Sequence, residues 1–180
     1  FEADFRKYVD TYVSSSFNYF SFLRPISELQ IGKLFSKNKK YFMDFKSCNA
    51  GSKQDIWCGN CPKCLFANII LSPFLSPQEL MKIFGENLYD KMVLKSAFDE
   101  LTGHVPVKPF ECVGTVSEVN EAIQLAIQKY YTGAGTLPYL LSLYVKRHSE
   151  LVVNSPGSWN NEHNLSSFYE KILHHVSGAE

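Results

Sequence analysis

The chain has 180 residues, 45% of them hydrophobic and 14% aromatic, which is enough apolar surface for a domain core of ordinary size. Eighteen basic residues balance eighteen acidic ones, so the positive field that attracts nucleic acid or anionic lipid is missing. The longest apolar runs fall well short of the roughly 20 residues of a membrane span. These features predict a soluble protein that has neither nucleic acid nor a membrane as its partner.

Helical periodicity dominates the N-terminal third of the chain. Apolar side chains at helical spacing predict one helix over residues 3–16 and a second that starts near Pro25 and ends in the basic turn 36–40. Residues 41–46 alternate instead, with Tyr41, Met43 and Phe45 on one face, and predict a short strand.

The remainder of the chain also reads as helix. LFANIILSPFL at 65–75 predicts a buried helix, Ser76-Pro77 predicts the capped start of another, and three helices are expected between 61 and 101. The glycines and prolines of 103–114 predict an irregular loop. Helices follow over 117–131, 137–151 and 165–176, with a polar loop around Trp159 before the last. The fold class is therefore mainly α, with little β.

Four cysteines lie within seventeen residues, in the segment CNAGSKQDIWCGNCPKC. Cys48 is followed after nine residues by Cys58, and two-residue spacers then separate Cys58, Cys61 and Cys64. Such spacers let two sulfurs face one ion, and four thiolates form a closed tetrahedral zinc site with a structural role. The predicted feature is a four-cysteine zinc knuckle in a reducing, cytoplasmic protein.

The surroundings of the cysteines bear on their charge. Cys61 and Cys64 lie at a predicted helix start, where the helix dipole favours thiolate over thiol. Four thiolates and one zinc ion carry a net charge of about minus two, and Lys46, Lys53 and Lys63 are placed to offset part of it.

Two alternatives to zinc remain open. An iron–sulfur cluster also uses closely spaced cysteines, but the ferredoxin run places its fourth cysteine downstream and before a proline. Here the fourth, Cys48, lies upstream, and Pro62 follows Cys61. A disulfide or redox pair formed by Cys58 and Cys61 is the other alternative.

A second candidate site lies in KPFECVG at 108–114, which brings Lys108, Glu111 and the fifth cysteine, Cys112, into one loop. A reaction that inverts a carbon centre needs an acid and a base, and these residues could supply them. The alternative is that Phe110, Cys112 and Val113 pack into the core while Lys108 and Glu111 are solvated.

Arg24, in FLRPISEL, is a candidate for binding a phosphate or carboxylate of a cofactor or substrate through its planar guanidinium group. The alternative role for an arginine beside a helix start is a surface ion pair.

The runs FLRPISEL, YFMDFKSCN, WCGNCPKCLF, ELMKIFG and KPFECVG, over residues 22–114, resemble the C-terminal region of bacterial epimerases that act on UDP-N-acetylmuramoyl-L-alanyl-L-glutamate. The cysteine region is more distantly similar to PP-loop ATP pyrophosphatases such as the queuosine-precursor synthases. Cys48, Cys58, Cys61 and Cys64 carry over as zinc ligands. The resemblance implies an ATP- and Mg²⁺-dependent epimerisation of the terminal L-glutamate during peptidoglycan synthesis.

Neither an SGGKDS-like loop nor a GxxxxGK[ST] loop occurs in the 180 residues. We therefore expect an upstream ATP-binding domain of a larger α/β enzyme as the partner, with the isolated chain inactive. The predicted organisation is a zinc-knuckle helical domain at 1–114 and a helical extension at 115–180, packed as one unit. The alternative function is a zinc-stabilised protein-interaction module without catalytic activity.

Overall fold

The computed structural model describes residues 1–131, 136–148 and 159–178, and within these ranges the chain is helical and contains no strand. The α-helices are α1 (Glu2–Tyr12), α2 (Glu28–Ser36), α3 (Pro62–Leu71), α4 (Pro77–Phe84), α5 (Lys95–Leu101), α6 (Val116–Tyr131), α7 (Tyr139–Arg147) and α8 (Ser167–Ser177). Short 3₁₀ helices are η1 (Lys39–Tyr41), η2 (Ser52–Gln54), η3 (Leu88–Asp90) and η4 (Met92–Leu94).

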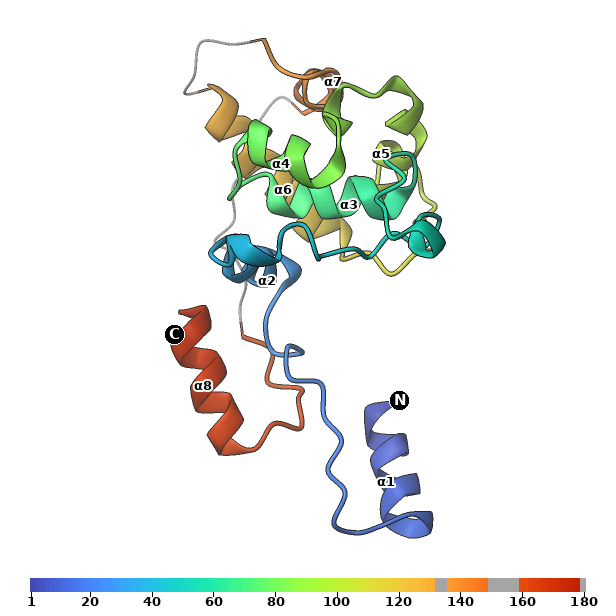
Figure 1. Ribbon diagram of the computed structural model, residues 1–180, viewed down its shortest axis with the longest axis vertical. Coiled ribbons are helices and arrows are strands. Elements are labelled where there is room, and N and C mark those ends of the chain that lie inside the picture. Colours follow the sequence, from blue (N-terminus) through green and yellow to red (C-terminus); the bar gives the residue numbers. More distant parts are fainter. Residues whose placement is uncertain (132–135, 149–158, 179–180) are drawn as a thin grey trace.

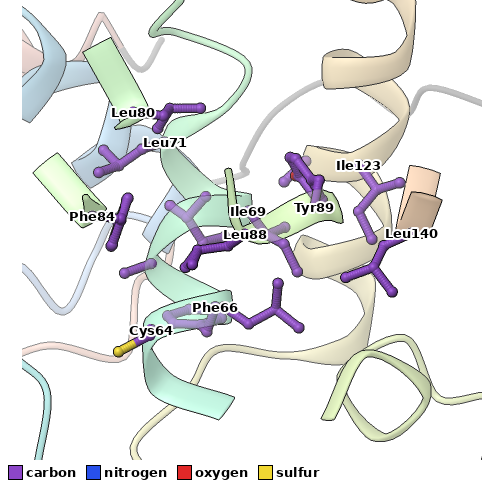
Figure 2. Packing of buried hydrophobic residues seen from close by; sticks show 14 of the residues in the cluster. Cys64, Phe66, Ile69, Leu71, Leu80, Phe84, Leu88, Tyr89, Ile123 and Leu140 are labelled. Atoms are coloured by element: carbon purple, nitrogen blue, oxygen red, sulfur yellow. The ribbon is translucent and has the colours of Figure 1, made fainter. Parts of the chain in front are cut away.

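Helix α3 is the centre of the core, and α2, α4, α5 and α6 all pack against it. Every residue of α3 from 64 to 71 is buried, and all of them except Asn68 are apolar. Figure 2 shows its side chains pointing toward their neighbours, with Ile69 beside Leu88 and Leu71 near Leu80. The predicted buried helix is confirmed up to Leu71, where it ends rather than continuing to 75, and the same helix carries Cys64 into the core.

Local capping sets several helix starts. The Ser76 side chain accepts a hydrogen bond from the amide of Glu79, and the Glu79 carboxylate accepts one from the amide of Ser76, at the helix start that the sequence predicts. The second helix begins later than predicted, because Ser27 forms the same kind of capping box with Gln30. Pro25 precedes that cap and lies outside α2.

The predicted strand at 41–46 is wrong. Tyr41 ends η1, and the chain then turns with Tyr41 and Met43 exposed while Phe42 is buried. Alternating side chains form a strand only where a neighbouring strand accepts the backbone hydrogen bonds, and none is present in the described residues. Phe45 packs on Phe35 and Trp57 instead.

Other boundaries differ in smaller ways. The first helix ends at Tyr12 rather than at 16, and α6 matches the predicted helix at 117–131 almost residue for residue. Residues 103–114 contain no helix, as predicted. The predicted helix at 137–151 is present as α7, but residues 149–151, and 154–158 of the predicted polar loop, lie outside the described ranges.

Helices α1 and α8 extend from the cluster formed by α2 to α7 (Figure 1). Tyr169 of α8 packs against Phe20 and Phe22, with ring centroids 5.0 and 5.9 Å apart, and Arg6 of α1 donates a hydrogen bond to the Tyr19 carbonyl. Helix α8 also contacts α2. None of the described helices combines the length and the apolar character that crossing a membrane requires.

Candidate metal centre

The four cysteines predicted as ligands come together in space. All four Sγ atoms lie within 4.8 Å of one another. The Sγ atoms of Cys48 and Cys61 are 3.9 Å apart, those of Cys58 and Cys64 3.7 Å, and those of Cys61 and Cys64 3.4 Å. A disulfide bond measures about 2.05 Å, and all four are free thiols. No disulfide therefore joins any two of these four cysteines in the structure.

These separations fit a single ion. Zinc–sulfur bonds of about 2.3 Å in a tetrahedron place the sulfurs about 3.8 Å apart. An iron–sulfur cluster would have to place several iron and sulfide atoms between the same four sulfurs, and it therefore needs wider sulfur–sulfur separations than a single ion does. The donor set and its spacing thus suit one tetrahedral ion held by thiolates.

Backbone amides surround the sulfurs. Gly51 N donates to Cys48 Sγ at 3.2 Å, Asn60 N to Cys58 Sγ at 3.5 Å, and Cys64 N to Cys61 Sγ at 3.5 Å. The last bond makes Cys61 the N-cap of α3, with Pro62 at the first helical position. The helix start predicted from the sequence therefore also orients two of the four clustered cysteines.

Two glycines make this loop possible. Gly59 has φ +66°, and a Cβ on it would lie 2.5 Å from Glu86 Oε1, which is itself paired with Lys91. A Cβ on Gly51 would lie 2.1 Å from the carbonyl oxygen of Ile56. Gly51 is not among the residues predicted for this site, although a glycine three residues after a clustered cysteine is a detectable signal, because its amide can reach the sulfur.

Packing the thiols together changes their ionisation. Burial raises the pKa of the Cys48 thiol, but hydrogen bonds from the amides of Cys58 and Gly51 outweigh burial and lower this pKa to about 7. Burial raises the pKa of Cys61 to about 11 and that of Cys64 further. Burial of Cys61 and Cys64 thus opposes the effect of the helix dipole, which favours the thiolate form. Four close sulfurs can all ionise only with a cation between them.

Aromatic side chains tie the cysteine loop to the core. Trp57 Nε1 donates to the carbonyl of Phe45 at 3.1 Å, and the Trp57 ring packs between Phe45 and Phe84 at centroid distances of 5.2 and 4.9 Å. Trp57 is not among the residues predicted for this site. A tryptophan next to one of the clustered cysteines is the available signal, since its ring must be buried and its N–H satisfied.

The 108–114 loop lies beside the cysteine region. Glu111 accepts a hydrogen bond from Asn49 Nδ2 at 2.8 Å, and Lys108 Nζ donates to the carbonyl of Val113 at 3.1 Å. Phe110 is fully exposed and Cys112 is exposed. The alternative that these residues pack into the core is therefore wrong for Phe110 and Cys112, whereas Val113 is partly buried against the core. A catalytic role for Cys112, Glu111 or Lys108 stays a prediction.

Arg24 lies far from the four cysteines in the sequence and contacts the segment before α8. Its Nε donates to the Glu162 carbonyl at 2.7 Å, and no ion pair of Arg24 is present among the described residues. The side chain lines a cleft of about 520 Å³ together with His163 and Asn164. Binding of an anion by Arg24 stays a prediction.

The family of the chain follows from comparison with known proteins. The family model described as the MurL C-terminal domain matches residues 35–142, a range that contains the four cysteines and Cys112. No solved structure matches the chain.

Three curated relatives carry the same printed name, UDP-N-acetyl-alpha-D-muramoyl-L-alanyl-L-glutamate epimerase. The chain is 39% identical to the protein of Xanthomonas oryzae pv. oryzae over 129 residues, which cover 68% of the chain and 29% of that protein. It is 38% identical to the Micromonospora protein over 115 residues, 62% of the chain and 26% of the relative. It is 40% identical to the Salinispora tropica protein over 111 residues, which cover 59% of the chain and 24% of that protein.

The matched region thus spans less than a third of the length of these relatives. The family model covers more than half of the chain. The resemblance noted in the sequence is confirmed, and the chain belongs to the MurL C-terminal domain family.

Proposed function

We propose that this chain is the zinc-binding C-terminal domain of an ATP-dependent epimerase. The reaction is inversion of the terminal L-glutamate of UDP-N-acetylmuramoyl-L-alanyl-L-glutamate, in the cytoplasm, during synthesis of peptidoglycan precursors. The observation that carries the proposal is the family match over residues 35–142 together with three relatives named for this reaction. Five free thiols in one chain fit a reducing compartment.

The metal in this proposal is zinc, held by Cys48, Cys58, Cys61 and Cys64. When bound, zinc supplies a cross-link between the loop 48–58 and the first turn of α3, and it leaves no open position for water or substrate. Its contribution is to folding, because the binding free energy of a structural metal is folding free energy. ATP and Mg²⁺ act elsewhere, since no phosphate-binding loop occurs in the 180 residues.

The activity is tested by a chimera. Residues 35–142 of this chain replace the matching segment of the Xanthomonas relative, and the product of the reaction with ATP and Mg²⁺ is hydrolysed and analysed for D-glutamate. We expect D-glutamate from the chimera and none from the 180-residue chain alone. A folded, zinc-loaded chimera that forms no D-glutamate would contradict the proposal.

The zinc site is tested by substitution within the 180-residue chain. Cys58→Ser should reduce bound zinc from one equivalent to a small fraction and destabilise the fold by several kcal/mol. This corresponds to a fall in melting temperature of roughly 10 °C for a chain of this size. Metal content is measured by inductively coupled plasma mass spectrometry and melting by circular dichroism.

Cys112→Ser is the matched control, because Cys112 is exposed and lies outside the cluster. It should keep one zinc and the parent melting temperature. Equal zinc content and stability in both variants would exclude a structural zinc at the four cysteines. Bound iron with sulfide would instead support the iron–sulfur alternative.

A second function, a zinc-stabilised interaction module without catalysis, is favoured by one observation. Large apolar side chains are exposed on the two helices that extend from the core, among them Tyr12 at 74% and Phe168 at 66%. Exposed apolar groups that gather on one part of a molecule are typical of binding surfaces. An inactive chimera that still folds would support this function.

A further inference from the structure

A pocket of about 260 Å³ lies between α2 and α3, beside the cysteine cluster. The two helices cross closely at Gly32, where a Cβ would lie 2.9 Å from Ile70 Cγ2. Phe35 and Phe66 form part of the walls, and Ala67 also lines the cavity. Apolar walls of this kind bind the aliphatic part of a ligand more favourably than they bind water.

Four side chains with polar groups interrupt these walls: Glu28, Ser47, Lys63 and Cys112. Lys63 is the one basic residue among the lining residues, and its Nζ makes no hydrogen bond or ion pair within the described part of the chain. Lys63 is half-buried, and an unpaired ammonium group beside an apolar cavity favours an anionic group on a bound ligand.

Glu28 is the acidic group at this pocket. Burial, followed by the nearby Glu118, raises the pKa of the Glu28 carboxyl, and Lys63 acts in the opposite direction. The pocket therefore combines apolar walls with one basic and one acidic side chain.

We infer that this pocket binds the L-alanyl-L-glutamyl end of the substrate named in the relatives, with Lys63 pairing with a glutamyl carboxylate. The inference rests on the proposed function. A methyl group and two methylenes match the apolar walls, the negative charge matches Lys63, and a cavity with the volume of roughly nine water molecules accommodates most of a dipeptide. The 108–114 loop places Cys112 at the same pocket.

Cys112 gives a direct readout of occupancy, because it is the single thiol outside the cysteine cluster. The zinc-loaded 180-residue chain is treated with iodoacetamide, with and without L-alanyl-L-glutamate, and alkylation of Cys112 is followed by peptide mass spectrometry. Calorimetric titration gives the affinity for the same dipeptide. We expect saturating dipeptide to slow alkylation of Cys112 at least several-fold.

Two variants locate the binding. Lys63→Met should weaken dipeptide binding about tenfold or more through loss of the charge-assisted pair. Lys53→Met is its control, because Lys53 is exposed and does not line the pocket. Ala67→Leu fills the cavity and should abolish protection while Lys63 remains, with melting temperature and zinc content showing that the fold is intact.

Unchanged affinity in both Lys63→Met and Ala67→Leu, with no protection of Cys112, would overturn the inference and leave the proposed function standing. Protection by glutarate but not by the dipeptide would also overturn it. The chimera assay reports on the reaction independently, so failure there with a dipeptide-binding pocket would count against the proposed function alone.

Discussion

Gly59 turns the chain between two of the clustered cysteines, and its backbone conformation and surroundings both require the absence of a side chain. Gly59→Ala should lower the free energy of unfolding by about 2 kcal/mol, because a left-handed non-glycine residue is strained and the new methyl group displaces Glu86 from Lys91. Urea denaturation of the zinc-loaded chain measures this change.

Gly85→Ala is the control at the residue scale. Gly85 ends α4 with φ +82°, and nothing lies within 4 Å of a Cβ built on it. The Gly85→Ala variant should therefore lose only about 1 kcal/mol of its free energy of unfolding, through the conformational strain of a left-handed alanine. Equal losses in the two variants would show that contact with Glu86 contributes nothing.

The sequence predicts the clustering of the four cysteines well and the burial of the side chains at 108–114 poorly, for a physical reason. Cysteine spacing is a local property, so it determines which sulfurs can meet in one loop. The exposure of Phe110 depends on how the loop is fixed by distant partners, such as Asn49 hydrogen-bonding to Glu111. An apolar residue in such a loop looks like a core residue until these partners are known.

At the scale of single helices, α4 and α8 both begin after a serine, but with different caps. Ser76 forms a complete capping box, whereas Ser166 makes no side-chain hydrogen bond to its helix. Ser76→Ala should therefore destabilise the protein by about 1 kcal/mol, and Ser166→Ala should change the stability by a few tenths at most. Chemical denaturation of both variants checks the pair, and a larger loss for Ser166→Ala would contradict the observed caps.

The start of α4 can be predicted because its signal is local, whereas the predicted strand at 41–46 fails because its signal is not. Ser76, Pro77 and Glu79 specify a helix start by themselves. Alternation over 41–46 is compatible with a strand, but a strand also needs a partner elsewhere in the chain. The aromatic Phe45 is drawn to Phe35 and Trp57 instead, and the segment folds as a turn.

Asp99 joins distant parts of the molecule. Its carboxylate pairs with Arg147 of α7 at 2.6 Å and with Lys95 of α5 at 2.7 Å, and it is largely buried. Burial raises the pKa of Asp99, but the bonds from Arg147 and Lys95 outweigh it and hold this pKa below its ordinary value of 3.8. The pairing of α5 with α7 could not be read from the sequence, because it joins residues 48 positions apart.

Asp99→Asn should destabilise the protein by roughly 3 kcal/mol at neutral pH, since it leaves Arg147 partly buried without its partner. The contribution of Asp99 is complete above the pKa of the unfolded state, and it is lost as the pH falls through the lower folded pKa. The difference between parent and variant should therefore shrink below about pH 4. Urea denaturation between pH 7 and pH 3 measures it, with Asp10→Asn on exposed α1 as control. A difference that stays constant with pH would contradict the assignment.

The segment 45–48 contributes both to the pocket between α2 and α3 and to the cysteine cluster. Phe45 and Ser47 line the pocket between α2 and α3, and Cys48 supplies a sulfur to the cysteine cluster. Consider a ligand that binds the pocket only when segment 45–48 is folded as described. Such a ligand must raise the affinity of the cysteines for their ion. The ion must then raise the affinity of the pocket for the ligand by the same factor. Metal supply to the protein would then set how much ligand it holds.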